Sequence, residues 1–182
     1  RGARAGFLTV LKELRHAYDA SPERVAVAAD EIITVVQHRR RAAAGGGLPN
    51  VDVLHAAYAY YQRAFDPTWG GIEGAPKFPS SLPIRFLLRY FRRFGGEALG
   101  MAELTLQRLA TGGIYDQIGG GFHRYSVDAE WLVPHFEKML YDNALLVSAY
   151  LEAWQVTGRT EFATIAHDTL AYLQREMTAP EG

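Results

Sequence analysis

The residues best suited to chemistry gather between Gly112 and Asn143, where 32 residues include five glycines, six aromatic residues, five carboxylates and two histidines. Glycine this dense is not typical of a helix interior, where each one costs roughly 1 kcal/mol relative to alanine. It favours a loop that brings backbone close to a partner. Carboxylates beside aromatic faces and an arginine can grip a polar, hydroxylated ligand. An equally simple interpretation is a long structural loop whose polar groups satisfy one another.

Four residues of this stretch are candidate acid–base groups: His123, His135, Asp116 and Glu137. Histidine beside a carboxylate can transfer protons near neutral pH. Glycines around Asp116 and His123 would present these two side chains openly. His135 follows a proline and is expected in the first turn of a helix, where the helix dipole disfavours a charged imidazole. A carboxylate in contact with the ring should favour the charged form more strongly than the dipole opposes it. A buried network that fixes the loop to this helix is the alternative.

A second group of residues is predicted to contact a substrate, because they are aromatic or charged and lie in this stretch or in the loop before it. They are Trp69, Lys77, Tyr115, Arg124, Tyr125, Asp128, Trp131, Tyr141 and Asp142. Phe122 would add a further aromatic face. Lys77 lies between prolines, and a brace for the acidic loop is the simpler interpretation of its role.

Several kinds of chemistry find no support in the sequence. The two histidines lie twelve residues apart, without the HExxH or His-x-His spacing of a metal site. The run Gly119–Gly121 lacks the lysine and the Ser/Thr of a phosphate loop, and there is no Gly-x-Ser-x-Gly elbow. We therefore expect no metal, no cofactor, no bound nucleotide and no serine-hydrolase chemistry.

The composition narrows the class of protein. The chain has 182 residues, 48% of them hydrophobic, a formal net charge of −1 and no cysteine. A nearly neutral chain is not typical of a dedicated nucleic-acid binder, and no apolar run approaches the roughly 20 residues of a membrane span. Without cysteine there is no thiol chemistry within the chain. We expect a cytoplasmic location, no nucleic-acid or membrane partner, and, because the chain does not begin with Met, a fragment of a longer protein.

Seven stretches carry apolar residues every three to four positions, the spacing of one face of an α-helix. They predict helices over 7–19, 22–41, 51–65, 82–94, 97–111, 135–156 and 160–177. Ser21, Pro22 and Glu23 are typical of a helix start, with a capping hydroxyl, a proline at the first helical position and an acid in the first turn. Residues 42–49 (AAAGGGLP) are low in complexity and are the expected linker.

The predicted connections alternate between long and short. The long ones are 66–81 and 112–134, and the short ones are turns at Gly95–Gly96 and at Gly158. Antiparallel helices joined by short turns form αα-hairpins, so alternate connections lie at opposite ends. We therefore expect the two long loops, with whatever follows Pro180, to share one rim of a rigid helical scaffold. Functional residues commonly lie on such loops.

Strand signals are few. Residues 121–127 alternate in polarity and predict a short hairpin with 131–133. The sixth helix is expected to follow at once, and His135, Lys138 and Asp142, spaced i, i+3 and i+7, would share one of its faces.

The motif GAPKFP at Gly74–Pro79 and, above all, the stretch Gly112–Asp142 closely resemble the spermatogenesis-associated protein 20 family, also called YyaL-like proteins. The resemblance covers essentially the whole chain. It implies an N-terminal thioredoxin-like domain followed by an (α/α)6 barrel, similar to those of six-hairpin glycosidases and of N-acylglucosamine and cellobiose 2-epimerases. Residues 1–41 would be the helical tail of the thioredoxin-like region, and 50–182 the first half of the barrel.

The implied fold is all-α: antiparallel αα-hairpins forming about half of an (α/α)6 toroid, with one short hairpin in its rim loop. The rest of the same polypeptide, namely the thioredoxin-like domain and the second half of the barrel, would be its main partner.

The resemblance supplies no reaction, so whether the barrel is an enzyme stays open. The leading hypothesis is a carbohydrate-active or carbohydrate-binding barrel with an epimerase- or isomerase-like activity on a sugar-like small molecule. The alternative is a recognition module that presents a protein or thiol partner to the redox domain, with no catalysis in the barrel.

Overall fold

The computed structural model describes residues 6–42 and 48–179, and the chain divides into two compact units, Arg1–Leu48 and Pro49–Gly182. Residues 43–47 of the expected linker at 42–49 lie outside the described residues, and so does the chain after Ala179. The assignment of residues 1–41 to a thioredoxin-like region stays a prediction.

The first unit is a pair of helices, α1 (Phe7–Ala20) and α2 (Pro22–Ala42). The backbone N–H of Ser21 donates to the carbonyl of Ala17 at 3.1 Å and ends α1, and α2 begins at Pro22 as the sequence predicts. No residue of α1 is buried, and large apolar side chains of both helices, such as Phe7 and Ile32, are exposed. Helices of this kind gain their stability by packing against another surface.

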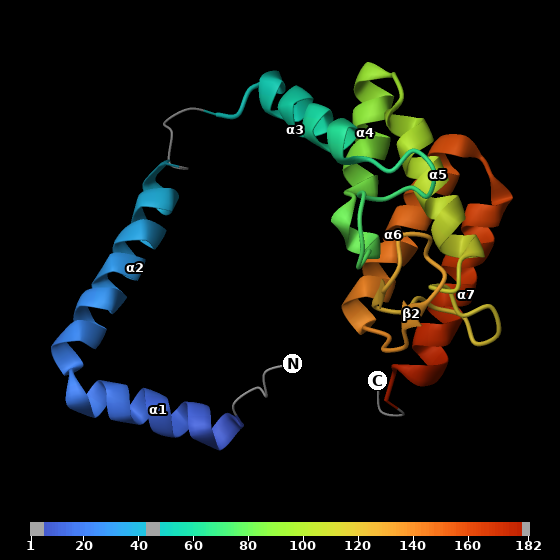
Figure 1. The fold of residues 1–182 in the computed structure, drawn as a ribbon. Helices are drawn as coiled ribbons and strands as arrows, with labels where there is room; N and C mark the ends of the chain where they lie inside the picture. The colour runs from blue at the N-terminus through green and yellow to red at the C-terminus, as the bar shows by residue number, and fades with distance from the viewer. Residues whose placement is uncertain (1–5, 43–47, 180–182) are drawn as a thin grey trace. The chain divides into compact units, whose positions relative to one another are not determined.

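The helices of the second unit are α3 (Val51–Ala64), α4 (Ile84–Phe94), α5 (Ala98–Thr111), α6 (Leu140–Thr157) and α7 (Thr160–Glu176) (Figure 1). All of them are predicted from the apolar spacing, and a 3-10 turn, η1 (Pro79–Ser81), precedes α4. Their buried faces form one core that includes Leu87, Leu109 and Phe162. The Tyr150 hydroxyl donates to the carbonyl of Leu106 at 2.7 Å and ties α6 to α5.

The helices alternate between two positions. α4 and α6, which follow the long connections, pack directly against each other, whereas α5 and α7 form hairpins with them. This is the alternation of inner and outer helices in a helical toroid. Tyr141, Leu145 and Leu151 are exposed on α6, so this inner helix keeps an uncovered apolar face.

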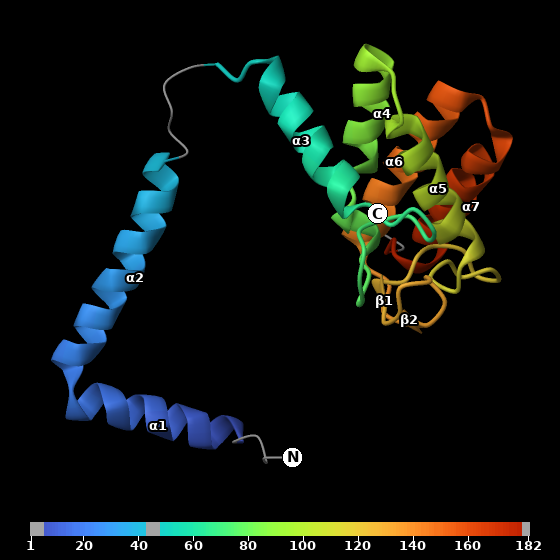
Figure 2. The ribbon, with the colours of Figure 1, turned by 45° about the horizontal axis from the view of Figure 1, so that its top comes forward.

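The short turns and the long loops lie at opposite ends of the helices (Figure 2). Gly95 after α4 and Gly158 after α6 both have φ of 72°, the left-handed region that glycine adopts without strain. At the other end the long loops pair through Lys77 and Ser126, whose backbone groups exchange two hydrogen bonds of 2.8 Å. The expected shared rim is therefore confirmed for both loops. The chain after Pro180, which is expected on the same rim, lies outside the described residues.

The rim contains the predicted hairpin, but its pairing is displaced. β1 (Tyr125–Ser126) pairs with β2 (Pro134–His135) in antiparallel fashion, with Tyr125 opposite His135. Val127 donates to the carbonyl of Val133 at 2.9 Å just inside this pair. The second arm thus extends past the predicted 131–133.

The predicted start of the sixth helix is wrong by five residues, since α6 begins at Leu140 and not at His135. The backbone before it is extended because it pairs with the other arm, and Arg124 donates to the carbonyl of Glu137 at 2.7 Å. His135 and Lys138 therefore lie before the helix and share no helical face with Asp142. The predicted effect of a helix dipole on His135 does not apply.

Candidate functional site

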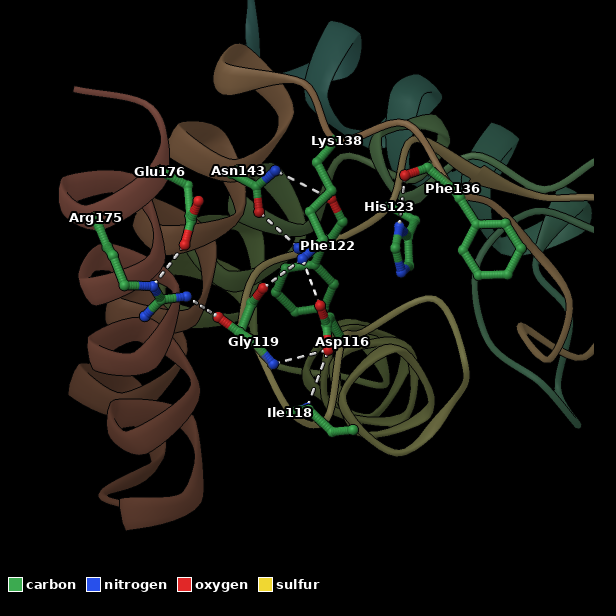
Figure 3. A network of polar contacts seen from close by, with 11 residues as sticks. Asp116, Ile118, Gly119, Phe122, His123, Phe136, Lys138, Asn143, Arg175 and Glu176 are labelled. Atoms are coloured by element: carbon green, nitrogen blue, oxygen red, sulfur yellow. Dashed lines mark hydrogen bonds and ion pairs between the residues drawn. The ribbon is translucent and has the colours of Figure 1, made fainter. Parts of the chain in front are cut away.

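Asp116 is held within its own loop (Figure 3). Its Oδ1 accepts from the backbone N–H of Ile118 at 3.0 Å and of Gly119 at 2.8 Å, and its Oδ2 accepts from Nζ of Lys138 at 2.8 Å. Lys138 also donates to the carbonyl of Gly120 at 2.8 Å. The backbone bond from Gly119 and the Lys138 ammonium lower the pKa of the Asp116 carboxyl. The Asp116 carboxylate is therefore ionised, and donors of its own loop already occupy both of its oxygens.

The loop that contains Trp69 has the same arrangement at an offset of 50 residues. Oδ1 of Asp66 accepts from the N–H of Thr68 at 2.9 Å and of Trp69 at 2.8 Å. Oδ2 of Asp66 accepts from Nζ of Lys77 at 2.5 Å. Asp66 and Lys77 thus occupy the roles of Asp116 and Lys138.

The backbone of the two loops corresponds bond by bond. In the first loop, the N–H groups of Asp66, Gly70 and Glu73 donate to the carbonyls of Gly71, Asp66 and Ala64. In the second loop, the N–H groups of Asp116, Gly120 and His123 donate to the carbonyls of Gly121, Asp116 and Ile114. All six donor–acceptor distances lie between 2.8 and 3.0 Å. The segments FDPTWGGI and YDQIGGGF carry this repeat in the sequence. Composition alone misses it, whereas comparison at a fixed offset finds it. An arrangement present in both loops belongs to the scaffold.

The second loop differs from the first by an insertion. Lysine follows its aspartate partner by 11 residues in the first loop and by 22 in the second. Asp128 organises the added residues, because its carboxylate accepts from the N–H groups of Glu130, Leu132 and Val133 at 2.7, 3.1 and 2.6 Å. Burial raises the pKa of Asp128, but these bonds outweigh burial and the pKa is lowered. Asp128 therefore shapes the hairpin.

Most of the predicted aromatic platforms lie inside the rim. Trp131 is fully buried at φ 66°, and its Nε1 donates to the carbonyl of Trp69 at 2.8 Å. The Lys77 ammonium lies 5.4 Å from the centre of the Trp131 ring. Tyr115 and Phe122 are buried against each other, with ring centres 4.8 Å apart. In this structure these rings support the loops from within and present no open face to a ligand.

His123 is buried, with Nδ1 3.1 Å from the carbonyl of Phe136 (Figure 3). A carbonyl only accepts, so Nδ1 carries the proton and Nε2 is left as an acceptor. Burial lowers the pKa of His123, with a further decrease from Lys138, although the Phe136 carbonyl and Asp116 act in the opposite direction. The ring is therefore a neutral imidazole whose Nε2 has no hydrogen-bond partner among the described residues.

Three rings are stacked at the open side of the rim. Tyr125 lies between Phe78 and His135, at 4.8 Å from each ring centre and with interplanar angles of 30° and 13°. Oε2 of Glu137 accepts from Nη1 of Arg124 at 3.0 Å and lies 3.5 Å from Nδ1 of His135. His135 thus lies beside a carboxylate, as expected, but from a strand and at a separation too long for a good hydrogen bond. These five side chains are the rim stack.

Asp142, in the first turn of α6, borders a cavity of about 180 Å³ between α6 and the η1–α4 segment. Its walls are mostly apolar, and Arg85 and Ser80 contribute the other polar groups: the lining is Pro79, Ser80, Leu82, Pro83, Ile84, Arg85, Phe86, Asp142, Leu145, Leu146 and Ala149. Asp142 is only 9% exposed and has no hydrogen-bond partner in the described part of the chain. Burial raises the pKa of its carboxyl, and the charge of Arg124 opposes that rise.

The neighbours of Asp142 have different roles. Tyr141 is exposed and does not line the cavity. Asn143 is buried, where its side chain accepts from the N–H of Phe122 at 2.6 Å and donates to the carbonyls of Phe122 and Met139 at 3.0 and 2.9 Å. Asn143 joins the loop to α6, a role that the sequence does not predict because an amide in a helical pattern gives no signal of its own.

Within residues 6–42 and 48–179, no group of three or more His, Asp or Glu side chains is placed to hold a metal ion. No helix in the same ranges is both long enough and apolar enough to span a bilayer.

The fold has solved counterparts. A sugar epimerase from a ruminal bacterium superposes with a TM-score of 0.60 at 20% identity, covering 69% of this chain and 35% of that one. Cellobiose 2-epimerase from Spirochaeta thermophila superposes with a TM-score of 0.57 at 24% identity, covering 68% of this chain and 35% of that one. At these identities the likeness concerns the fold. The second unit is, as predicted, about half of an (α/α)6 toroid built from antiparallel αα-hairpins.

Curated relatives match the chain itself. Spermatogenesis-associated protein 20 of Homo sapiens is 35% identical over 187 residues, which is 98% of this chain and 24% of that protein. The Mus musculus protein of the same name is 42% identical over 123 residues, or 65% of this chain and 16% of that protein. The resemblance predicted from the sequence is confirmed, and the chain spans a quarter or less of these relatives' length. No family model matches the chain.

Proposed function

We propose that the second unit is the N-terminal half of a carbohydrate-active barrel, whose site combines the cavity beside Asp142 with the rim stack, from which the charge of Arg124 acts on the Asp142 carboxyl. The observation that carries the proposal is the Asp142 carboxyl, which is 9% exposed, borders a cavity that it shares with Arg85 and has no hydrogen-bond partner among the described residues. A ligand hydroxyl that enters the cavity can therefore replace water as the partner of this carboxyl. The shared fold with sugar epimerases supports a sugar as that ligand.

The reaction we propose is an epimerisation or isomerisation. Such a reaction removes a proton from the carbon next to a carbonyl and returns a proton to that carbon or to its neighbour. His123 is the proposed base, because its ring is neutral and its Nε2 has no hydrogen-bond partner among the described residues. Arg124, Glu137, His135 and Tyr125 would orient the sugar at the rim, and Asp142 would hold a hydroxyl. Lys77, Asp116, Asp128 and Trp131 belong to the scaffold in this proposal.

Asp142→Asn in the full-length protein tests the site. Wild-type protein should be stabilised in a thermal-shift screen by at least one mono- or disaccharide, and D142N should bind that sugar about tenfold or more weakly. Asp168→Asn is the matched control, because Asp168 is a half-exposed acid of α7 away from the cavity. Equal sugar affinity in D142N and wild type would exclude Asp142 from the site, and no response to any sugar would refute the function.

The pH dependence of the same variant gives a second readout. Folding raises the pKa of Asp142, so the folded state holds the proton more tightly and wild type loses stability as pH rises from the unfolded to the folded pKa. Asparagine cannot ionise. Without sugar, D142N should therefore melt above wild type at about pH 8 and lose this advantage near about pH 4.

The rival function is recognition of a protein or thiol partner for an N-terminal redox domain. Exposed apolar side chains on the rim favour it, namely Ile118, Leu132 and Phe136. Phe136→Ser should then slow thiol–disulfide turnover of the natural partner and leave sugar binding undetectable. If the complete barrel converts a sugar after removal of the redox domain, the rival is refuted.

A further inference from the structure

A second cavity, with a mostly polar lining, lies between the inner helices, further along them from the rim. α4 carries Arg85, Arg89 and Arg92 at spacings i, i+4 and i+7, which places them on one face. α6 faces them with Glu152 and Gln155, and a cavity of about 220 Å³ lies between Arg89, Arg92, Glu152 and Gln155. We call these five residues the arginine groove.

The ion pairs in the arginine groove are unbalanced. A single oxygen, Oε1 of Glu152, accepts from Nε and Nη2 of Arg85 at 2.7 and 2.5 Å and from Nη2 of Arg89 at 2.8 Å. Arg92 lines the same cavity and forms no ion pair within the described part of the chain. Three guanidinium groups therefore face one carboxylate.

Little else on these helices neutralises the excess charge. α4 contains no acidic residue, and the other acid of α6, Asp142, lies ten residues before Glu152. At 1.5 Å per residue this is about 15 Å along the helix. A stripe of arginines on a solvated outer face would need no counterion. Here the Arg85 and Arg89 side chains are 42% and 65% exposed, but they converge on a groove between two packed inner helices and already bind one carboxylate oxygen.

We propose that the arginine groove binds the phosphate group of a phosphorylated sugar. The sugar part rests on the proposed function, and the anion site stands on the groove itself. A phosphate offers three acceptor oxygens and up to two charges, which suits several guanidinium forks better than one carboxylate does. Arg85 borders the Asp142 cavity and also bonds to Glu152, so it links the two parts of the site.

Inorganic phosphate is the probe, added to the full-length protein at constant ionic strength with sulfate, acetate and chloride as comparisons. Phosphate should raise the melting temperature more than the other anions, and titration calorimetry should give one site. The double variant R89Q/R92Q should bind phosphate at least about tenfold more weakly. Glu152→Gln removes the competing carboxylate and should bind phosphate more tightly.

Arg93→Gln is the matched control. Arg93 is on the same helix, but its guanidinium lies over the ring of Phe94, 5.1 Å from the ring centre, and away from the cavity. R93Q should bind phosphate as wild type does. If the double variant does not fold, R92Q alone decides, since Arg92 lies outside the Glu152 pairs. Equal phosphate affinity in R92Q and wild type would overturn the proposal, and so would an equal effect of acetate or sulfate.

The outcomes separate this proposal from the proposed function. A protein that binds phosphate through Arg89 and Arg92 but no sugar keeps the anion site and refutes the carbohydrate function. A protein that binds a neutral sugar through Asp142 but no phosphate supports the carbohydrate function and refutes the anion site.

Discussion

Two carboxyl groups of the same rim have opposite environments. Asp116 accepts two backbone N–H groups and an ammonium, which favour its charged form, whereas Asp142 lies in an apolar cavity that disfavours it. The number of donors within reach separates a structural acid from a reactive one. Residue type and neighbouring glycines do not separate them, so Asp116 and Asp142 are both candidates in the sequence. Among the described residues, Asp116 has hydrogen-bond donors and Asp142 has none.

Asp116→Asn should destabilise the full-length protein by about 1–3 kcal/mol at neutral pH, because Lys138 loses its counterion in a part-buried site. Folding lowers the pKa of Asp116, so its contribution is complete above the unfolded-state value of about 3.9 and is lost as pH falls through the lower folded-state pKa. The difference in melting temperature between D116N and wild type should stay constant down to about pH 5 and shrink below about pH 4. Equal melting temperatures at neutral pH would refute the brace.

At the scale of elements, a glycine of the second rim loop and a glycine of the short turn between α4 and α5 share a backbone conformation but differ in what surrounds them. Gly121 has φ 78°, and an added Cβ would lie 2.4 Å from Cδ1 of Tyr172. Gly96 has nearly the same φ, 79°, with no atom within 4 Å of such a Cβ. The pair therefore separates the cost of backbone conformation from the cost of a steric clash.

Gly96→Ala should cost about 1–2 kcal/mol, the usual cost of a left-handed conformation with a side chain. Gly121→Ala should cost about 1–3 kcal/mol more, because Tyr172 must also move. Urea unfolding of the full-length variants measures both. If the two variants are equally stable, Gly121 is required for its φ alone and the close packing of the loop on α7 has no energetic weight.

The sequence predicts those elements whose boundaries are set by local patterns, and not those set by contacts with distant segments. Helices with regular apolar spacing, from Val51 to Glu176, are predicted nearly to the residue, because periodicity and glycine stops are local signals. The start of α6 is not, because the backbone of Glu137 is taken up by Arg124, a partner from another segment. Trp131 is expected to face a ligand and is instead buried on Trp69, a contact made 62 residues away in the chain. Local patterns carry no information on such partners.

At the scale of the whole molecule, the second unit exposes the face that a closed toroid would cover. Tyr141, Leu145 and Leu151 of α6 are all more than 40% exposed. Apolar faces of this kind drive association in water. Residues 49–182 expressed alone should therefore self-associate or melt without cooperativity, as size-exclusion chromatography with light scattering and calorimetry would report.

A double variant tests whether the exposed apolar face of α6 causes the self-association. The double substitution Leu145→Glu and Leu151→Glu places charge on this face, so it should shift the same fragment towards monomer. A wild-type fragment that is monomeric and melts cooperatively would contradict the half-toroid interpretation of its inner face.

The repeated loops also have a consequence for synthesis on the ribosome. Lys77 is 2% exposed, and its ammonium donates to Asp66 and to the carbonyl of Ala129, which lies 52 residues later in the chain. At about 5–20 residues per second, roughly 3–10 seconds pass between the translation of Lys77 and that of Ala129. During this interval the first loop has its carboxylate but not the segment that covers its cation. The cation of the nascent first loop therefore stays open to water until the second loop emerges and covers it, so the first loop is completed by the second.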